Sequence, residues 1–233
     1  QLMPTALSGG YYGGAGLFVT RMNELRAEYE GLGHQVLTIT AGDNLMPGKE
    51  LAASTTGNDF YHAMLLDQAG FEVATIGNHE FDAGPDVTAN FIAAAKSPTF
   101  LSANLDFSAH KPMNDLFTSG KIAKSTTIDV SFGARSIRVG VVGAVTENLN
   151  FISSPLPVKI NTKVAEAIQS EIDTLKSNGA QLIILSSHLQ GISEELNIIK
   201  NLKDVDVVLS GGGDDLLANP NDLLIPIPPV THW

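Results

Sequence analysis

Residues 75–82 read TIGNHEFD, and this stretch is the most informative part of the chain for the fold. Residues 72–76 form an apolar run that predicts a buried strand. The polar residues of the quoted stretch begin where this strand ends. An amide beside an imidazole at a strand end, as in Asn78-His79, has few purely structural reasons to exist. The stretch therefore predicts a strand that brings functional side chains to one edge of a sheet.

Short apolar runs alternate with amphipathic stretches along the rest of the chain. Residues 163–178 show apolar positions at helical spacing, and residues 181–187 are almost continuously apolar, as in a strand covered on both faces. This alternation predicts an α/β domain. The expected strands are residues 36–40, 72–76, 99–103, 181–187 and 205–209, with a β-pair at 122–130 and 136–142. The expected helices are residues 17–30, 58–68 and 163–178, one helix that follows Gly84 and one that begins at Ser193.

Four predicted strands end in polar groups of the metal-ligand type. These groups are Asp43, the pair Asn78-His79, His188 and the pair Asp214-Asp215. In open α/β sheets ligands bind at the carboxyl ends of the strands, and the glycines near each group allow sharp turns. Each group alone is typical of a turn, but their common position predicts a site. Oxygen and nitrogen donors without sulfur suit zinc, manganese or iron, and an aspartate can bridge two ions about 3.5–4 Å apart.

The composition limits the classes of function. The 233 residues are 43% apolar, which is globular, and the net charge of −11 argues against a nucleic-acid partner. No run approaches the roughly 18 apolar residues that would cross a bilayer. The absence of cysteine excludes disulfides, thiolate metal sites and cysteine nucleophiles.

With these motifs the chain resembles the calcineurin-like metallophosphoesterases and, within them, the 5′-nucleotidase family. The resemblance runs from about Gly10 to Asp215 and is most specific at residues 77–82. It implies a four-layer αββα sandwich of two mixed sheets, hydrolysis of phosphomonoesters such as 5′-nucleotides, and an extracellular or periplasmic location. The matching segments are AGDN at 41–44, TIGNHEFD at 75–82, LSANL at 101–105, VGVVG at 139–143 and LSSH at 185–188.

The resemblance also implies a role for individual residues. Asp43 would bridge two divalent metal ions, and Asn78 and His188 would hold one of them. His79 would stabilise charge near the phosphate, and Asp82 would orient its ring. The implied reaction is attack of a metal-activated water on phosphorus; the ions are expected to be zinc, manganese or iron, with calcium and magnesium left open.

The chain departs from the family pattern at two places. The family begins with a strand ending in Asp-x-His, and no such pair precedes Gly9. Gly213 stands where the family has a second-site histidine, so that either Asp214 or Asp215 is expected to replace it. We therefore expect residues 1–218 to be a catalytic domain without its first strand and its C-terminal partner domain, followed by a proline-rich tail at 219–233. The oligomeric state is left open.

These departures keep an alternative function open: a non-catalytic relative of the same fold that acts as a binding or structural protein. A nucleotide-binding module built on the glycine-rich residues 9–16 is disfavoured, because the Lys-Ser/Thr ending of a phosphate loop is missing. Outside the predicted site, His62 is expected to be a solvated or capping residue on a helix.

Overall fold

Two four-stranded sheets form the centre of the molecule. The computed structural model describes residues 2–7, 10–57, 59–133, 135–213, 218, 219 and 221. The strand order is β3-β4-β5-β7 in the first sheet and β12-β11-β9-β8 in the second. Within these two sheets the described pairs are parallel, except that β8 pairs antiparallel with β9. The strands are β3 (Ile39–Thr40), β4 (Val73–Thr75), β5 (Thr99–Leu101), β7 (Ile122–Ala123), β8 (Ser125–Phe132), β9 (Arg135–Val145), β11 (Leu182–His188) and β12 (Val207–Ser210).

The sheets pack face to face because successive side chains of each strand point to opposite faces. On β5, Leu101 packs between the sheets, whereas its neighbour Phe100 packs outward. On β9, Val141 likewise packs between the sheets, whereas Val142 packs outward among residues of α7. The apolar residues therefore form one layer between the sheets and one on each outer face.

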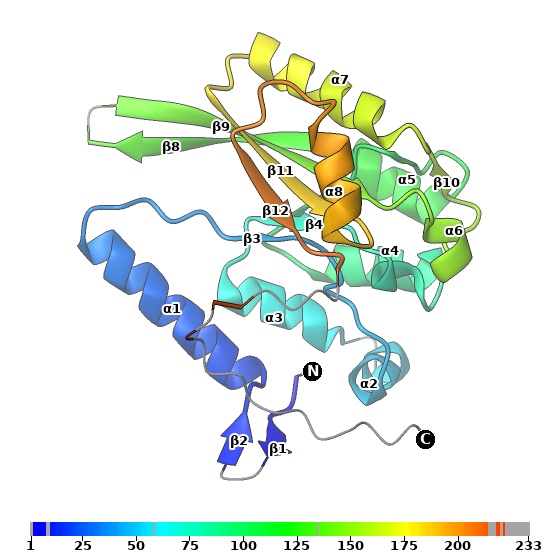
Figure 1. Cartoon of the computed structure of the whole chain (residues 1–233). Coiled ribbons are helices and arrows are strands. Elements are labelled where there is room, and N and C mark those ends of the chain that lie inside the picture. Colours follow the sequence, from blue (N-terminus) through cyan, green and yellow to red (C-terminus); the bar gives the residue numbers. More distant parts are fainter. Residues whose placement is uncertain are drawn as a thin grey trace.

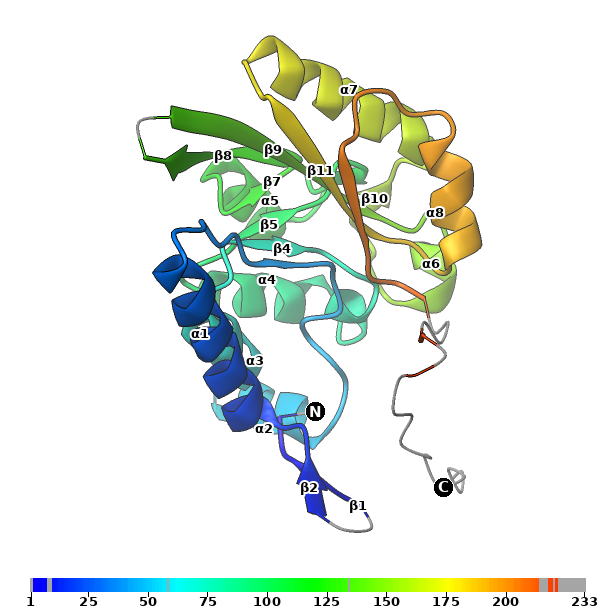
Figure 2. The same cartoon turned by 60° about the vertical axis from the view of Figure 1, so that its left-hand side comes forward.

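Helices cover both outer faces, as Figures 1 and 2 show. Helices α1, α3, α4 and α5 contribute to the apolar layer outside the first sheet, and α7 and α8 contribute to that outside the second. The expected four-layer αββα sandwich is confirmed, with one mixed sheet and one whose described pairs are all parallel. The helices are α1 (Ala15–Gly31), α3 (Tyr61–Ala69), α4 (Pro85–Ala94), α5 (Lys111–Thr118), α7 (Val164–Ser177) and α8 (Ile192–Ile199).

Gly143 on β9 lies directly against β5 of the other sheet. A Cβ at this position would overlap the side chain and backbone of Leu101 on β5. The carbonyl oxygen of Gly143 accepts a hydrogen bond from the N–H of Ala103 at 2.7 Å. The missing side chain thus lets the backbones of the two sheets bond directly near the edge where both deliver the predicted site residues.

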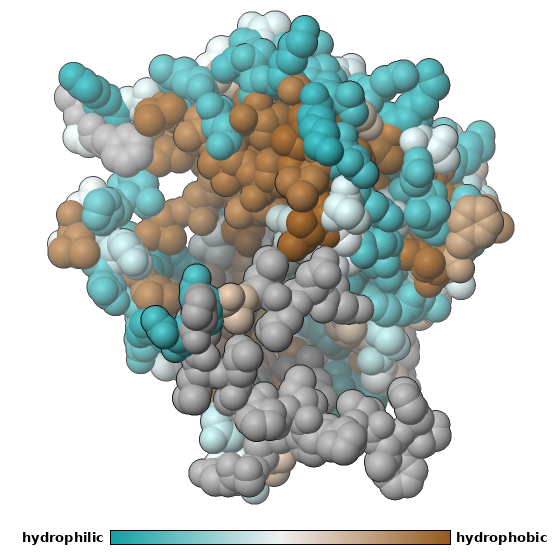
Figure 3. Space-filling view, in the orientation of Figure 1, coloured by the Kyte–Doolittle hydropathy of each residue, from teal (hydrophilic) through white to brown (hydrophobic). Residues whose placement is uncertain are grey.

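The apolar layer between the sheets is buried at its centre and more exposed to solvent near β12. Val73 and Val141 are fully buried, whereas Ile184 on β11 is only partly buried and Val207 on the edge strand β12 is 40% exposed. Figure 3 shows apolar side chains gathered over this part of the second sheet. The edge of the second sheet therefore presents apolar surface.

Several elements differ from the sequence predictions. The strand expected at residues 36–40 is limited to β3, and the helix expected at 58–68 begins at Tyr61. The tail expected at 219–233 lies almost wholly outside the described residues. Within the described residues, none of the helices is long and apolar enough to cross a membrane. Elements that were not predicted are β1 (Thr5–Leu7), β2 (Gly10–Tyr12), α2 (Lys49–Gly57), η1 (His79–Phe81), β6 (Leu105–Asp106), α5 (Lys111–Thr118), α6 (Leu149–Ile152) and β10 (Lys159–Ile160).

Candidate active site

Side chains from three strand ends meet at the carboxyl edge of the sheets. Asp43 follows β3, Asn78 follows β4, and His188 ends β11 in the other sheet. The Nε2 atom of His188 lies 3.1 Å from Oδ1 of Asp43 and 3.1 Å from Oδ1 of Asn78. The structure thus brings together a carboxylate, an amide oxygen and an imidazole, and their role as metal ligands stays a prediction.

The ring of His188 is held in one orientation. It is 1% exposed, and its Nδ1 lies 2.6 Å from the carbonyl oxygen of Ala41. A carbonyl can only accept, so in the neutral ring Nδ1 carries the proton and Nε2 keeps its lone pair. Gly42, with φ +104°, makes room, because a Cβ there would overlap the ring. Burial disfavours the charged ring, but the hydrogen bond and charge of Asp43 outweigh it and raise the pKa of His188 above 6.5.

Asp43 has a backbone conformation that is unusual for a non-glycine residue. Its φ of 54° lies in the left-handed region, which costs a non-glycine residue roughly 1–2 kcal/mol. Its Oδ1 accepts a hydrogen bond from the N–H of His79 at 3.0 Å. Burial opposes ionisation, yet the hydrogen bond and charge of His188 together with His79 lower the pKa of Asp43 below 3.8. The carboxylate is therefore kept ionised beside the two rings.

His79 lies at the open side of this cluster. Its Nδ1 is 2.5 Å from Oδ2 of Asp82, whose Oδ1 accepts a hydrogen bond from Ser153 at 2.8 Å. Its Nε2 is 3.9 Å from Oδ2 of Asp43, and the side chain is 34% exposed. Partial burial opposes the charged ring, but the hydrogen bond to Asp82 and the charge of Asp43 raise the pKa of His79. The ring is thus oriented by one carboxylate and can reach a bound molecule through Nε2.

Glu80 is a site residue that sequence reasoning missed. It is fully buried and accepts backbone hydrogen bonds from Asp43, Asn44 and Leu45 on one loop and from Gly77 on another. Burial and the charge of Asp43 raise the pKa of Glu80 to about 7, although His188 and the backbone donors oppose that shift. Its place in the TIGNHEFD stretch was the available signal.

Two further contacts to the site were also missed. Gln190 donates from Nε2 to Oδ1 of Asn78 at 3.1 Å, so it lies beside the amide that the sequence singled out. Beneath the site, the hydroxyl of Thr75 on β4 donates to the carbonyl oxygen of Ser186 on β11, and the two hydroxyl oxygens lie 2.7 Å apart. This buried polar contact joins the two strands that deliver Asn78 and His188.

The remaining predicted ligands, Asp214 and Asp215, lie outside the described residues. The loop that leads to them does approach the site. The N–H of Gly211 donates to the carbonyl oxygen of Ser187 at 2.9 Å. A Cβ on Gly211 would overlap Ala41, and one on Gly212 would overlap Leu189.

The described donors fit one metal ion in part. Asp43 and Asn78 offer oxygens, and Nε2 of His188, which carries the lone pair in the neutral ring, faces both. These are donor types that zinc, manganese and iron accept. Within the described ranges, no cluster of three or more histidine, aspartate or glutamate side chains is arranged around a common point. An additional donor is therefore needed to complete even one ion site.

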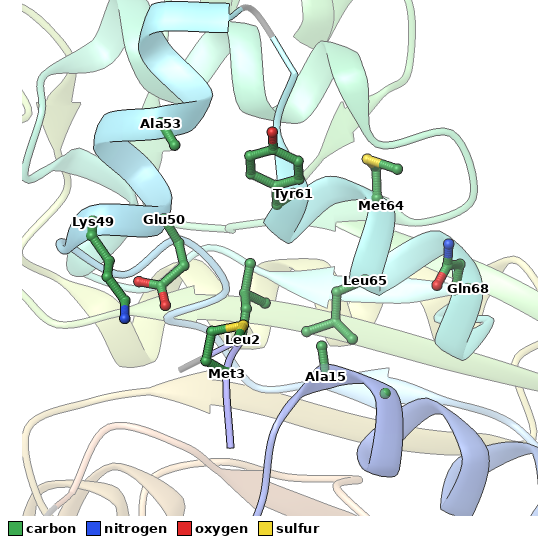
Figure 4. Close-up of a pocket in the computed structure, with 11 residues that line it drawn as sticks. Leu2, Met3, Ala15, Lys49, Glu50, Ala53, Tyr61, Met64, Leu65 and Gln68 are labelled. Atoms are coloured by element: carbon green, nitrogen blue, oxygen red, sulfur yellow. The ribbon is translucent and has the colours of Figure 1, made fainter. Parts of the chain in front are cut away.

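A separate cavity lies away from these residues. It has a volume of about 520 Å³ and is bounded by α1, α2, α3 and the start of the chain, as Figure 4 shows. Apolar side chains such as Leu2, Tyr61 and Leu65 line it, and no described site residue does. This cavity is therefore separate from the candidate active site.

The chain is similar to known 5′-nucleotidases in sequence and in structure. No family model matches the chain. A probable 5′-nucleotidase from Treponema pallidum is 29% identical over 222 residues, which is 95% of this chain but 34% of that protein. The crystal structure of a 5′-nucleotidase precursor from Thermus thermophilus is 27% identical, with a TM-score of 0.75 over 90% of this chain and 39% of that chain.

A third comparison extends the likeness in fold. A calcineurin-like phosphoesterase from Bacillus subtilis matches with a TM-score of 0.65 at 19% identity, over 84% of this chain and 63% of that chain. The chain spans about a third of the length of the curated relatives it matches. The resemblance stated from the sequence is confirmed: over most of its length the chain is similar to part of the 5′-nucleotidases, and it has the fold of the calcineurin-like phosphoesterases.

Proposed function

We propose that the chain is the catalytic part of a metal-dependent phosphoesterase that hydrolyses phosphomonoesters, with 5′-nucleotides as substrates. The observation that carries this proposal is the meeting of Asp43, Asn78 and His188 beside the His79–Asp82 pair. The similarity to 5′-nucleotidases supports the substrate class, although it extends over about a third of those proteins.

The donors would be divided between two ions. Asn78 and His188 would hold one ion, Asp43 would bridge to a second, and either Asp214 or Asp215 would add an oxygen. Zinc, manganese or iron ions bound here would supply positive charge that neutralises the phosphoryl oxygens and makes water a better nucleophile. The protein contributes the fixed orientation of these donors, which the contact between His188 and Ala41 maintains.

His79 would act on the departing oxygen. Asp82 holds Nδ1 of the ring, which leaves Nε2 facing the open side of the site. Partial burial disfavours the charged ring, but the hydrogen bond to Asp82 and the charge of Asp43 raise the pKa of His79 and so stabilise its protonated form. As the water oxygen bonds to phosphorus and the ester P–O bond breaks, the N–H at Nε2 can donate to the leaving oxygen and stabilise its charge.

The test is phosphate release from AMP by the purified chain and by the longest protein that its gene encodes. Activity should appear with added Mn²⁺ or Zn²⁺, disappear with a chelator, and be lost in Asp43→Ala and His188→Ala. Equal phosphate release from the wild type and both variants, or release that a chelator leaves unchanged, would refute the proposal.

One observation favours a second candidate, a non-catalytic relative that binds without turnover. Gly213 stands where the family has a histidine, and the described carboxylates and imidazoles do not complete an ion site. Elemental analysis of the purified protein separates the two candidates. Two transition-metal ions per chain favour the enzyme, whereas a metal-free protein that still binds nucleotides favours the second candidate.

The resemblance also supports a proposal about the location of the protein and one about its domain boundary. We propose an extracellular or periplasmic location, which fractionation of the source cells would test. We also propose that residues 1–218 form the catalytic domain and that 219–233 are a linker. Limited proteolysis should then cut after residue 218 and leave a protected fragment, whereas cleavage that begins within the sheets would refute this boundary.

A further inference from the structure

Glu80 joins the two loops that carry the predicted metal donors. Its Oε1 accepts from the N–H groups of Asn44 and Leu45, and its Oε2 accepts from those of Asp43 and Gly77. The bonds to Asp43, Leu45 and Gly77 measure 3.1, 3.2 and 2.6 Å, respectively. A single side chain with no exposed surface thus satisfies four backbone donors from two strand ends.

Three of these donors belong to a turn whose backbone is strained. Asp43 has a φ of 54°, and the glycine before it has a φ of 104°. A non-glycine residue in this region persists only where surrounding contacts determine it. The N–H groups of residues 43–45 all point to Glu80, which is 35 to 37 positions away in the sequence. The carboxylate is therefore the common acceptor around which this turn closes.

The fourth donor ties the turn to the loop that carries Asn78. Gly77 lies so close to Asp43 that a Cβ on it would overlap both the backbone nitrogen and Oδ1 of Asp43. Asp43 in turn accepts from the N–H of His79. The position of each loop therefore depends on that of the other, and the buried Glu80 contacts both loops.

We propose that Glu80 is a positioning residue that presets the separation and orientation of Asp43 and Asn78. It touches neither substrate nor reacting atoms in this role. The expected effect of Glu80 on metal binding rests on the proposed function. Its effect on the arrangement of the two loops is independent of that function, because the loops can be studied in the metal-free protein.

The chemistry of Glu80 makes Glu80→Gln a sharp substitution. Each carboxylate oxygen accepts two N–H groups, so an amide placed either way turns its NH₂ toward two donors. The substitution preserves size and shape while removing two acceptor positions. Glu80→Asp is a milder variant, which keeps the charge but is one methylene shorter and cannot reach both loops equally.

Asp67 provides a matched control away from the site. Its Oδ1 accepts from the N–H groups of Lys96 and Ser97, both at 2.8 Å. It therefore ties the end of α3 to the segment after α4, at the edge of the first sheet opposite the site. Asp67→Ala removes a carboxylate that bonds two backbone donors without touching either loop of the site.

The first readout is backbone amide hydrogen exchange, followed by NMR in the metal-free chain. In Glu80→Gln we expect the amides of residues 43, 44, 45 and 77 to exchange at least tenfold faster, with core amides on β9 and β11 unchanged. Asp67→Ala should leave these four amides protected. In a folded Glu80→Gln protein, unchanged exchange at residues 43–45 and 77 would overturn the proposal. If Glu80→Gln does not fold, the same pattern in Glu80→Asp decides.

The second readout is Co²⁺ affinity and its visible absorption spectrum. We expect Glu80→Gln to bind Co²⁺ at least tenfold more weakly with an altered spectrum, and Asp67→Ala to match the wild type. Equal affinity and spectrum in Glu80→Gln would contradict the positioning role. If the wild type binds no Co²⁺, the proposed function fails, while the exchange of the four amides still decides the role of Glu80.

Discussion

The side-chain amide of Asn104 forms two hydrogen bonds with the backbone of Val145, accepting from its N–H at 3.0 Å and donating to its carbonyl oxygen at 2.8 Å. Both residues are at most 1% exposed, and they follow or end strands of different sheets. The next residue, Thr146, donates from its N–H to the carbonyl oxygen of His188 at 3.0 Å. A side chain from the first sheet thus supports the strand end that carries His188.

We expect Asn104→Ala to destabilise the protein by about 2–4 kcal/mol, because it leaves a buried N–H and a buried carbonyl of Val145 without partners. Urea denaturation measures this as a lower midpoint with an unchanged slope. Asn201→Ala is the control, since Asn201 is exposed and its side chain makes one bond to the carbonyl of Asn197. Losses of similar size in the two variants would contradict the bridging role of Asn104.

The close approach of Gly42 to His188 predicts a second effect. Gly42→Ala combines a positive φ of 104° with overlap between the new methyl group and the imidazole. Gly120→Ala combines a positive φ of 81° with open space. We expect Gly120→Ala to cost about 1–2 kcal/mol from backbone strain alone, and Gly42→Ala to cost more.

Thermal or urea unfolding measures the loss of stability in both glycine variants. The difference between the two losses is the cost of the overlap between the new methyl group and the ring of His188. Gly42→Ala should in addition weaken Co²⁺ binding, because the ring of His188 must move. A Gly42→Ala protein that is as stable as Gly120→Ala and binds Co²⁺ like the wild type would show that the ring is not confined by this glycine.

The His79–Asp82 pair predicts a selective loss of turnover. We expect His79→Gln to lower kcat for AMP roughly 10²- to 10⁴-fold, the usual contribution of a positioned acid or base, without changing the metal content. The chain offers a matched control in His110, which also pairs with a carboxylate: its Nε2 lies 3.1 Å from Oδ1 of the exposed Asp86. His110→Gln should keep full activity, and an equal decrease in the two variants would exclude a special role for His79.

The sequence predicted the strand ends better than the contacts between them. Each predicted site group follows an apolar run and lies near a glycine, so local pattern was sufficient to place Asp43, Asn78 and His188 at one edge. The bond between Thr75 and Ser186 joins residues 111 positions apart, and nothing in either local pattern indicates it. Contacts of this kind depend on how the two sheets stack, which single-strand patterns do not specify.

Among the helices that escaped prediction, α2 and α5 did so for local reasons. Helix α2 carries few large apolar residues in KELAASTTG, so its apolar periodicity is weak. Helix α5 begins KPMN after His110, whose ring accepts a weak hydrogen bond from the N–H of Met113 at 3.4 Å. The polar surroundings of that start are typical of a loop, whereas proline in the first turn is also compatible with a helix.

His62 shows where burial overturned a sequence expectation, and it yields a prediction about pH. The expected solvated or capping role is wrong: His62 is 6% exposed, and its Nδ1 has no hydrogen-bond partner in the described part of the chain. Burial lowers the pKa of His62 below 6.5, although the charge of Glu50 opposes the shift. The folded protein therefore binds a proton at this ring less readily than the unfolded chain does.

The direction of the pH effect follows from linkage. As pH falls below about 6.5, the unfolded state gains a proton that the folded state resists, so stability decreases, by at most about 1.4 kcal/mol per pH unit for one group. Above that pH both states are neutral at His62, and its contribution is constant. We expect His62→Leu to flatten the decrease in urea midpoint between pH 7 and pH 5, whereas His34→Gln at the exposed turn should not. An identical decrease in the wild type and His62→Leu would mean that other groups, such as the carboxylates, account for it.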